Sequence, residues 1–248
     1  MKDNFSTQSS QYALYRPFYP PELYHYLKSI IPHFERAWDC GTGNGQVAIA
    51  LSSFFKTVYA TDISSAQIQH ASTAPNISYS VQPAEKTDFP DEFFDFIIIA
   101  QAIHWFEFEQ FYAEVKRTSQ RHAICCVIGY GRIEISPEID RIIDHFYTVT
   151  IGKYWDPERK YIDENYQTIP FPFEEIIPPQ FTNELSWTLE HLIGYLNTWS
   201  AVHHAIKKNG FNPVDHILSE LKANWGDTES KQVRFPLLIR IGKIHKTK

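Results

Sequence analysis

The stretch WDCGTGNGQVAIAL, residues 38–51, decides the fold. It begins as an apolar strand that ends at an aspartate, continues with glycine at every second position, and resumes as an apolar helix. Because glycine has no Cβ, the backbone at Gly41, Gly43 and Gly45 can turn sharply and let a ligand approach closely. The helix that follows offers this ligand unpaired N–H groups and a partial positive end. The stretch therefore predicts a strand–turn–helix unit whose turn contacts a bound molecule.

Two aspartates near this turn indicate what the ligand carries. Dinucleotide-binding turns follow the spacing G-x-G-x-x-G, whereas here the spacing is G-x-G-x-G and Asp39 stands two positions before the first glycine. An acid there is badly placed beside a pyrophosphate and well placed beside a cationic group. Asp62 ends the next predicted strand, where a carboxylate can accept hydrogen bonds from both hydroxyls of a ribose. S-adenosylmethionine, with its ribose and its positively charged amino-acid part, fits both acids.

Strands and helices alternate on both sides of the turn. The strand patterns cover residues 35–40, 56–62, 77–82, 94–100 and 122–130. The helical patterns cover residues 20–31, 46–55, 64–74 and 105–118. The strand at 94–100 is apolar nearly throughout, as expected where both faces of a sheet are covered. This alternation predicts an α/β, Rossmann-like, mostly parallel sheet that is sandwiched by helices.

The regular alternation of strands and helices ends after residue 130. We expect a helix at 137–151, a loop-rich region rich in Pro, Tyr and Phe at 154–180, a strand at 181–188, helices at 189–208 and 213–225, and a closing strand at 231–244. The chain then divides into an N-terminal arm and cap helix (1–34), a ligand-binding core (35–130), an inserted or appended aromatic-rich lid over the substrate (131–180), and C-terminal helices and closing strands of the same domain (181–248).

The motif DCGTGNG resembles the first motif of class I S-adenosylmethionine-dependent methyltransferases. Further matches are YRPFYP, AEKTDFP, FDFIIIAQAIHWF and GYLNTWSA, at residues 15–20, 84–90, 94–106 and 194–201. Together they resemble the methyltransferase type 11 and trans-aconitate methyltransferase-like branch, over most of the chain. The resemblance implies a seven-stranded sheet with an antiparallel edge, S-adenosylmethionine as the cofactor, and a small-molecule methyl acceptor. A carboxylate or another oxygen is the accepting group we expect.

The resemblance also implies which residues hold the cofactor. Asp39 would bind the methionine part, directly or through water, and Asp62 would bind the ribose hydroxyls. Arg16 could pair with the carboxylate of the cofactor or of an acidic substrate, or lie on the surface of the N-terminal arm. The expected cofactor-binding set is Tyr15, Arg16, Asp39, Gly41, Thr42, Gly43, Gly45, Asp62, Ile63, Ala84, Glu85, Ala100 and Gln101. Of these, Glu85 and Gln101 could equally be solvated surface side chains.

His104, just past the strand at 94–100, is the candidate catalytic residue, because an imidazole can accept a proton near neutral pH. Alternatively, His104 bonds a backbone carbonyl and supports the loop. Trp105, Tyr195 and Trp199 are candidate substrate contacts, with core packing as the alternative. A carboxylate acceptor is already ionised at neutral pH and needs no strong base.

Composition narrows the choice of partners. The formal net charge is -6 and the sequence contains no block of Lys and Arg residues, so we expect no nucleic-acid partner. No apolar run is long enough for a membrane span, and the N-terminus has no apolar signal core. The three cysteines have neither disulfide nor metal-ligand spacing, which favours a cytoplasmic protein. His191, His203 and His204 do not form a ligand set, so we expect no metal.

Two other functions stay open at this stage. A nicotinamide-dependent oxidoreductase would share the strand–turn–helix unit, although the glycine spacing and Asp39 count against it. A non-catalytic module that binds S-adenosylmethionine would share every cofactor motif. The oligomeric state is left open.

Overall fold

The computed structural model describes residues 14–245, and a mostly parallel sheet runs through it. The strand order is β3-β2-β1-β4-β5-β8-β6, with β7 pairing with β8. The first five strands are parallel: β1 (Arg36–Cys40), β2 (Thr57–Asp62), β3 (Ile77–Val81), β4 (Phe94–Ala100) and β5 (Ser119–Tyr130). β1 lies in the middle of them, since Asp39 pairs with Ala60 of β2 and with Ile98 of β4.

The pairings made by the last strands are all antiparallel. β8 (Lys231–Lys243) runs antiparallel to β5 and pairs on its other side with β6 (Glu174–Ile176) and β7 (Thr182–Trp187). The sheet therefore has eight strands, one more than the seven expected, because the short strand β6 forms its edge. β6 has only three residues and none of them is buried, so its sequence carries no strand pattern.

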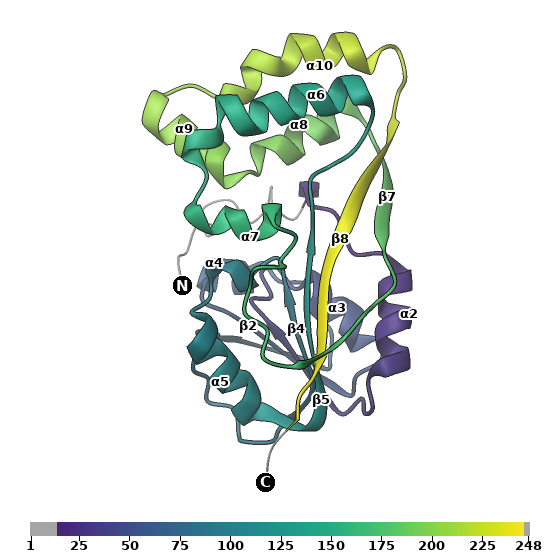
Figure 1. Ribbon diagram of the computed structural model, residues 1–248, viewed down its shortest axis with the longest axis vertical. Coiled ribbons are helices and arrows are strands. Elements are labelled where there is room, and N and C mark those ends of the chain that lie inside the picture. The colour runs from purple at the N-terminus through teal and green to yellow at the C-terminus, as the bar shows by residue number, and fades with distance from the viewer. Residues whose placement is uncertain (1–13, 246–248) are drawn as a thin grey trace.

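Helices cover both faces of the sheet (Figure 1). α2 (Pro21–Ile30) and α3 (Gln46–Ser52) bury their leucines and valine against one face, together with Ala37 of β1. α5 (Phe108–Thr118) buries Phe111 and Val115 against the other face, beside Trp38. The alternation of a strand sends Ala37 and Trp38 to opposite faces, so β1 contributes to both cores.

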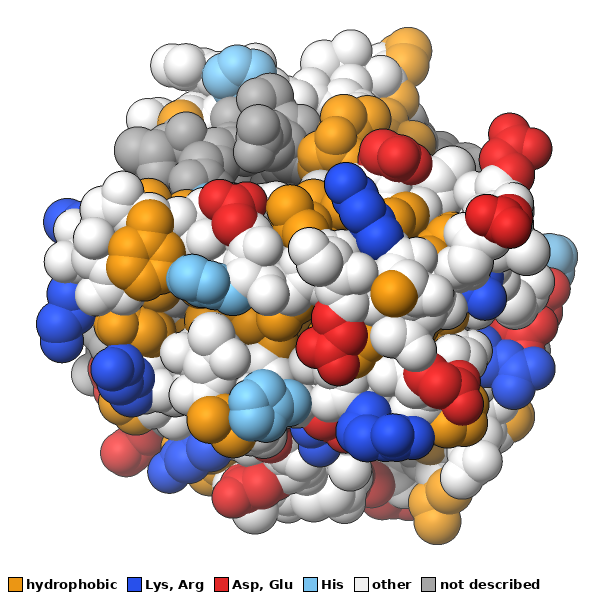
Figure 2. Space-filling model, turned by 90° about the horizontal axis from the view of Figure 1, so that it is seen from above, with side chains coloured by type: hydrophobic (Ala, Val, Ile, Leu, Met, Phe, Trp, Pro, Cys, Tyr) orange, Lys and Arg blue, Asp and Glu red, His pale blue; other side chains and the backbone are white. Residues whose placement is uncertain are grey.

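Four helices form a cluster beyond the carboxyl ends of the parallel strands (Figure 1). The helix cluster consists of α6 (Pro137–His145), α8 (Leu189–Asn197), α9 (Ser200–Asn209) and α10 (Leu218–Trp225). The short helix α7 (Lys160–Asp163) lies between the cluster and the sheet (Figure 1). Figure 2 looks onto the cluster and shows acidic and basic side chains interspersed over its outer surface.

Several predicted helices are interrupted in the structure. The helix expected at 189–208 is two helices, because Trp199 takes an extended conformation between them and buries its ring. The helix expected at 137–151 becomes a π-helical turn, η3 (Phe146–Thr150), after α6. The helix expected at 105–118 starts at Phe108, after a 3-10 turn, η2 (Ile103–Trp105).

The helix α4 (Ser65–Gln69) is shorter than the 64–74 expected. Ser64 caps it by accepting a hydrogen bond from the Gln67 N–H. The region expected to be loop-rich contains the 3-10 turns η4 (Gly152–Tyr154) and η5 (Pro157–Arg159) and the helix α7. A further 3-10 turn, η6 (Pro213–Ile217), precedes α10. Between residues 14 and 245, no helix combines the length and the apolar character that a membrane crossing requires.

Candidate active site

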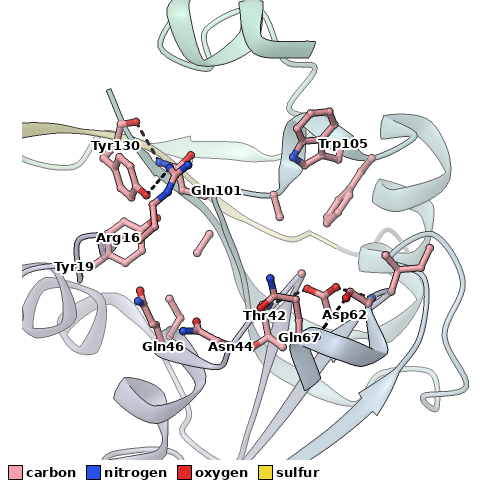
Figure 3. Close-up of a pocket in the computed structure, with 18 of the residues that line it drawn as sticks. Arg16, Tyr19, Thr42, Asn44, Gln46, Asp62, Gln67, Gln101, Trp105 and Tyr130 are labelled. Carbon is pink, nitrogen blue, oxygen red and sulfur yellow. Dashed lines mark hydrogen bonds between the residues drawn. The ribbon is translucent and has the colours of Figure 1, made fainter. Parts of the chain in front are cut away.

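A cleft opens at the carboxyl ends of β1, β2 and β4, where a parallel sheet binds its ligands. It contains about 850 Å³ of empty space, including the part open to solvent. Figure 3 shows Asn44, Thr42 and Asp62 along one side of the cleft, and Arg16, Gln101 and Trp105 along the other.

Nine of the residues singled out in the sequence line this cleft. They are Arg16, Gly41, Thr42, Gly43, Asp62, Ile63, Ala100, Gln101 and Trp105. They come from the N-terminal segment, the turn after β1, the end of β2 and the end of β4. The fold therefore brings together most of the predicted cofactor set.

The glycine turn leaves part of its backbone bare toward the cleft. Gly41 has φ +71° and Gly43 has φ +55°, a region that side chains with a Cβ rarely adopt. A Cβ on Gly41 would lie 2.6 Å from the Cβ of Ala102, so close packing requires glycine there. At Gly43 nothing lies within 4 Å of the position that a Cβ would take. The backbone at Gly43 is thus exposed to whatever occupies the cleft.

Asp39 lies beneath the turn and not on the cleft wall. Its side chain is fully buried, and its Oδ2 accepts a 2.5 Å hydrogen bond from the hydroxyl of Thr42, which does line the cleft. Burial raises the pKa of Asp39 from 3.8 to about 7, and the Thr42 hydroxyl and the Ala48 backbone oppose this rise. Asp39 can therefore act on a ligand in the cleft through Thr42.

Asp62 ends β2 and ties the glycine turn to that strand. Its Oδ2 accepts a 2.9 Å hydrogen bond from the Gly43 N–H, and its Oδ1 accepts one of 2.9 Å from the Ser64 N–H (Figure 3). Each carboxylate oxygen can accept a second hydrogen bond. Asp62 therefore fixes the turn and lines the cleft.

The end of β4 has a strained residue at the cleft wall. Gln101 has φ +53°, which is uncommon outside glycine, and its N–H donates to the carbonyl of Ile128 at 2.9 Å. Its side-chain Nε2 donates to the carbonyl of Tyr130 at 3.2 Å. Such strain persists where surrounding contacts hold it and is common at functional sites.

The N-terminal segment closes one side of the cleft. Arg16 donates from Nη1 to the hydroxyl of Tyr130 at 3.1 Å and from Nη2 to the carbonyl of Thr198 at 3.1 Å. Its guanidinium lies 5.3 Å from the centre of the Tyr195 ring. Arg16 thus links the N-terminal segment, the end of β5 and the helix cluster. The alternative in which Arg16 lies on the surface of the N-terminal arm is therefore wrong.

A second, smaller chamber adjoins the cleft, and His104 lines it. The chamber shares Arg16, Gln101 and Trp105 with the cleft and contains about 440 Å³ of empty space, including the open part. Burial lowers the pKa of His104 from 6.5 to about 3, and the charge of Arg159 adds to this effect. His104 is therefore neutral at physiological pH and a weak proton acceptor. Within residues 14–245 the buried Nδ1 of His104 does not make the hydrogen bond to a backbone carbonyl that the structural alternative assumed.

The other residues singled out in the sequence do not line the cleft. Tyr15 packs edge-on against His191, with ring centroids 5.3 Å apart. Gly45 is the N-cap of α3 and faces Tyr79. Ala84 is buried in the core on the α5 side, and Glu85 accepts a 3.1 Å hydrogen bond from the N–H of Glu107. Tyr195 and Trp199 are buried in the core of the helix cluster.

Several lining residues were not predicted. They are Pro17, Tyr19, Asn44, Gln46, Val47, Ser64, Gln67, Ala102, Phe106 and Tyr130. Asn44 and Gln46 lie in the glycine stretch itself, so its spacing could have identified them. Tyr130 ends a predicted parallel strand, a place that the sheet geometry marks for ligands. Between residues 14 and 245, no group of three His, Cys, Asp or Glu side chains is arranged to hold a metal ion.

Comparisons with known proteins agree with this geometry. Residues 38–127 match the family model described as a methyltransferase domain. A "putative methyltransferase" of Dictyostelium discoideum is 34% identical over 97% of this chain and 95% of its own length. The chain belongs to the class I S-adenosylmethionine-dependent methyltransferases.

Solved structures place this methyltransferase in the same fold. A "putative type II methyltransferase" from Anaeromyxobacter dehalogenans is 38% identical and aligns with a TM-score of 0.86 over 94% of this chain and 99% of that chain. A "putative methyltransferase" from Bacillus halodurans is 15% identical, with a TM-score of 0.53 over 92% of this chain and 100% of that chain, and shares the fold. The predicted family, fold class and enzyme class are confirmed, which sets aside the oxidoreductase and the non-catalytic module. The trans-aconitate-like branch stays a prediction.

The cleft of the methyltransferase fits S-adenosylmethionine. Its wall offers the bare backbone of Gly43, the carboxylate of Asp62 and the hydroxyl of Thr42. The Nε2 of Gln46 is enclosed at this wall and makes no hydrogen bond within residues 14–245. An enclosed donor without a partner is costly, which indicates that a ligand group completes it.

Proposed function

We propose that this methyltransferase methylates a small-molecule acceptor, and that the accepting atom is an oxygen of a carboxylate or a similar group. The observation that carries the proposal is the arrangement of the two cavities. Arg16, Gln101 and Trp105 line both the cleft and the smaller chamber, so a donor in one would meet an acceptor in the other at these residues. The chamber is a small pocket within the fold, which suits a small molecule and not a folded partner.

The binding roles follow from the cleft contacts. When bound, S-adenosylmethionine supplies a methyl group carried on a positively charged sulfur. Asp62 would accept hydrogen bonds from the ribose hydroxyls, and the Gly43 backbone would lie against the ligand. Thr42 would orient toward the amino-acid part, with Asp39 behind it as the negative charge. Gln46 would donate its enclosed Nε2–H to an acceptor atom of the ligand.

The acceptor side favours an oxygen that arrives ionised. His104 is neutral, and burial makes it a weak base because its pKa lies near 3. A carboxylate acceptor needs no base, whereas an alcohol or an ammonium must lose a proton. Arg16 and Arg159 both line the chamber and would attract an anion. These features support oxygen methylation of an acid over methylation of an amine.

Calorimetry with S-adenosylhomocysteine and with NAD tests the cofactor assignment. We expect S-adenosylhomocysteine to bind and NAD not to bind. Asp62→Ala should weaken S-adenosylhomocysteine about 10- to 100-fold, since hydrogen bonds to a charged group contribute about 1.5–3 kcal/mol. Asp144→Ala, which removes an exposed carboxylate paired with Arg132, is the matched control and should leave the affinity unchanged. Equal affinities of the Asp62→Ala variant and the wild type would refute the ribose assignment.

A methyl-donor consumption screen over small acids, phenols and amines tests the acceptor class. Turnover with acids, followed by detection of the methyl ester, is the expected result. Turnover confined to amines would contradict oxygen methylation. A cytoplasmic location and the absence of a nucleic-acid partner stay predictions of the sequence.

A further inference from the structure

The chamber beside the cleft contains polar atoms that the protein leaves unsatisfied. Its own lining, beyond the three residues shared with the cleft, is His104, Trp155, Asp156, Arg159, Ile162 and Ser200. Trp155 and Ile162 provide apolar wall, and the other four provide charge or hydrogen-bonding groups. They come from η2, the residues around η5, α7 and α9, so only the folded chain brings them together.

Arg159 is held by one edge of its guanidinium. Its Nε donates to the hydroxyl of Tyr147 at 2.7 Å, and the guanidinium lies 4.6 Å from the centre of the Trp155 ring. The nearest carboxylate oxygen is Asp163 Oδ1, 3.9 Å from Nε, and this oxygen accepts a hydrogen bond from Tyr147. Nη1 and Nη2 of Arg159 make no hydrogen bond to any described residue, so its outer edge is available to an anion.

Asp156 offers an acceptor in the same chamber. Its Oδ2 is enclosed and forms no hydrogen bond with the described part of the chain. The Nδ1 of His204 lies 3.9 Å from this oxygen. The same nitrogen lies closer, at 3.0 Å, to the carbonyl oxygen of Tyr154. A carbonyl can only accept, so the Nδ1 hydrogen of His204 is directed to Tyr154 and not to Asp156.

His104 adds a further unsatisfied atom. Its Nδ1 is enclosed and has no hydrogen-bond partner among residues 14–245. The imidazole is neutral, because burial and the charge of Arg159 lower its pKa to about 3. It therefore does not add a second positive charge beside Arg159, and its Nδ1 can donate or accept one hydrogen bond according to its tautomer.

Enclosed polar groups without partners are rare and costly in folded proteins. Two such atoms, Asp156 Oδ2 and His104 Nδ1, line one chamber next to the cofactor cleft. Together with the outer edge of the Arg159 guanidinium, they indicate a ligand that pairs with them. We propose that this chamber is the acceptor site, and that it takes a monocarboxylate whose carboxylate binds Arg159 and whose second polar group donates a hydrogen bond to Asp156. The donor is a hydroxyl or an ammonium. A second carboxylate is disfavoured, because it would face the negative charge of Asp156. This inference rests on the proposed function only for the identity of the neighbouring cleft.

A matched set of phenyl-substituted probes tests this chemistry. Mandelate has a carboxylate and a hydroxyl, and phenylglycine replaces the hydroxyl by an ammonium. Phenylacetate lacks the donor, 1-phenylethane-1,2-diol lacks the carboxylate, and phenylmalonate replaces the donor by a second carboxylate. Calorimetric titrations into the full chain, with and without saturating S-adenosylhomocysteine, measure each affinity. We expect mandelate or phenylglycine to bind at least about 10-fold more tightly than the other three, as the loss of one charge-assisted hydrogen bond predicts. The better of the two identifies the donor.

Two substitutions locate the contacts. Arg159→Met should weaken the preferred probe at least about 10-fold and remove its advantage over the diol. Asp156→Ala should reduce the affinity of the preferred probe to that of phenylacetate and should increase the affinity of phenylmalonate. Arg132→Met is the matched control, because the Arg132 guanidinium also lies over the Tyr147 ring, at 5.3 Å compared with 5.2 Å for Arg159, while it pairs with Asp144 and does not line the chamber. The control should bind every probe as the wild type does.

The affinity for S-adenosylhomocysteine distinguishes a failure of this inference from a failure of the proposed function. Wild-type affinity for S-adenosylhomocysteine in the Arg159→Met and Asp156→Ala variants shows that they are folded, so a selective loss of probe binding supports the inference. Wild-type probe affinity in these variants, or phenylmalonate as the tightest probe, would overturn the inference and leave the proposed function standing. A wild-type protein that binds no S-adenosylhomocysteine would refute the proposed function, while the probe titrations without it would still decide the chamber.

Discussion

Replacement of Asp39 by asparagine should make the stability of this methyltransferase less sensitive to pH. The Asp39 carboxyl is fully buried and has the Thr42 hydroxyl as its side-chain partner, at 2.5 Å. Burial raises its pKa from 3.8 in the unfolded chain to about 7, and the charge of Asp62 adds to the rise. The folded protein therefore holds this proton more tightly than the unfolded chain does.

The sign of the effect follows from this difference. At pH 5 the unfolded chain has already lost the proton of Asp39 and the folded protein has not. As the pH rises toward 7, each pH unit lowers the free energy of unfolding by about 1.4 kcal/mol, until the folded protein also ionises. From pH 5 to pH 8 the wild type thus loses about 2–3 kcal/mol through this single group. Above pH 7 the loss levels off.

Asp39→Asn keeps an oxygen that accepts the Thr42 hydrogen bond and removes the titration. Urea unfolding at pH 5, 6, 7 and 8, followed by circular dichroism, gives the free energy of unfolding of variant and wild type. The difference between the two free energies cancels the contribution of the other titrating groups. It should shift by about 2–3 kcal/mol in favour of the variant between pH 5 and pH 8. Asp144→Asn, at an exposed site, reports the general effect of removing a negative charge. A difference that is constant with pH, or that moves in favour of the wild type, would refute the reasoning.

Two further predictions concern His104 and Gly41. Since burial lowers the pKa of His104 from 6.5 to about 3, the unfolded chain gains a proton first as the pH falls, and the wild type loses stability below pH 6.5. Urea unfolding should therefore show His104→Phe gaining about 3 kcal/mol on the wild type between pH 7 and pH 4, and a constant difference would contradict the burial of a neutral imidazole. Gly41→Ala should lower the free energy of unfolding by about 2–4 kcal/mol, because its Cβ would meet Ala102 at 2.6 Å in a left-handed conformation. Gly210→Ala is the control, because Gly210 has φ +79° and no atom lies within 4 Å of the position of its Cβ. It measures the cost of the left-handed backbone alone and should lower the free energy of unfolding by only about 1 kcal/mol. Equal decreases in the two variants would exclude a contribution from the contact with Ala102.

The central strands could be predicted from the sequence because each has its own local signal. The pattern at residues 94–100 matches β4, Phe94–Ala100, since a strand covered on both faces is apolar at every position. The glycine turn could be predicted as well, because the glycine spacing, Asp39 and Asp62 together limit the chemical class of the ligand. Residues that follow these strands reach the cleft through the rule that parallel strands bind ligands at their carboxyl ends. Gly43, Asp62 and Gln101 were found in this way.

The helix cluster and the chamber could not be predicted in the same way. Nothing in the local sequence PERKY distinguishes Arg159 from other arginines on short helices. Its role depends on Trp155, four positions before it, and on Tyr147 of η3 and His104 of η2, which the fold brings to it. Arg16 depends on Thr198, a partner 182 positions along the chain. Contacts of this kind leave no periodic pattern.

His104 shows why a residue type alone does not define a catalytic role. Its position next to β4 marked it as a candidate base, and the structure does place it beside the cleft. The same burial that brings it there lowers its pKa to about 3, which removes its capacity to take a proton at neutral pH. In the acceptor chamber that we propose, methyl transfer relies on an acceptor that is already nucleophilic and on its orientation, and Arg159 is the charged group that would supply this orientation. A carboxylate meets both conditions, since it is ionised before it binds and its two oxygens match the free edge of a guanidinium.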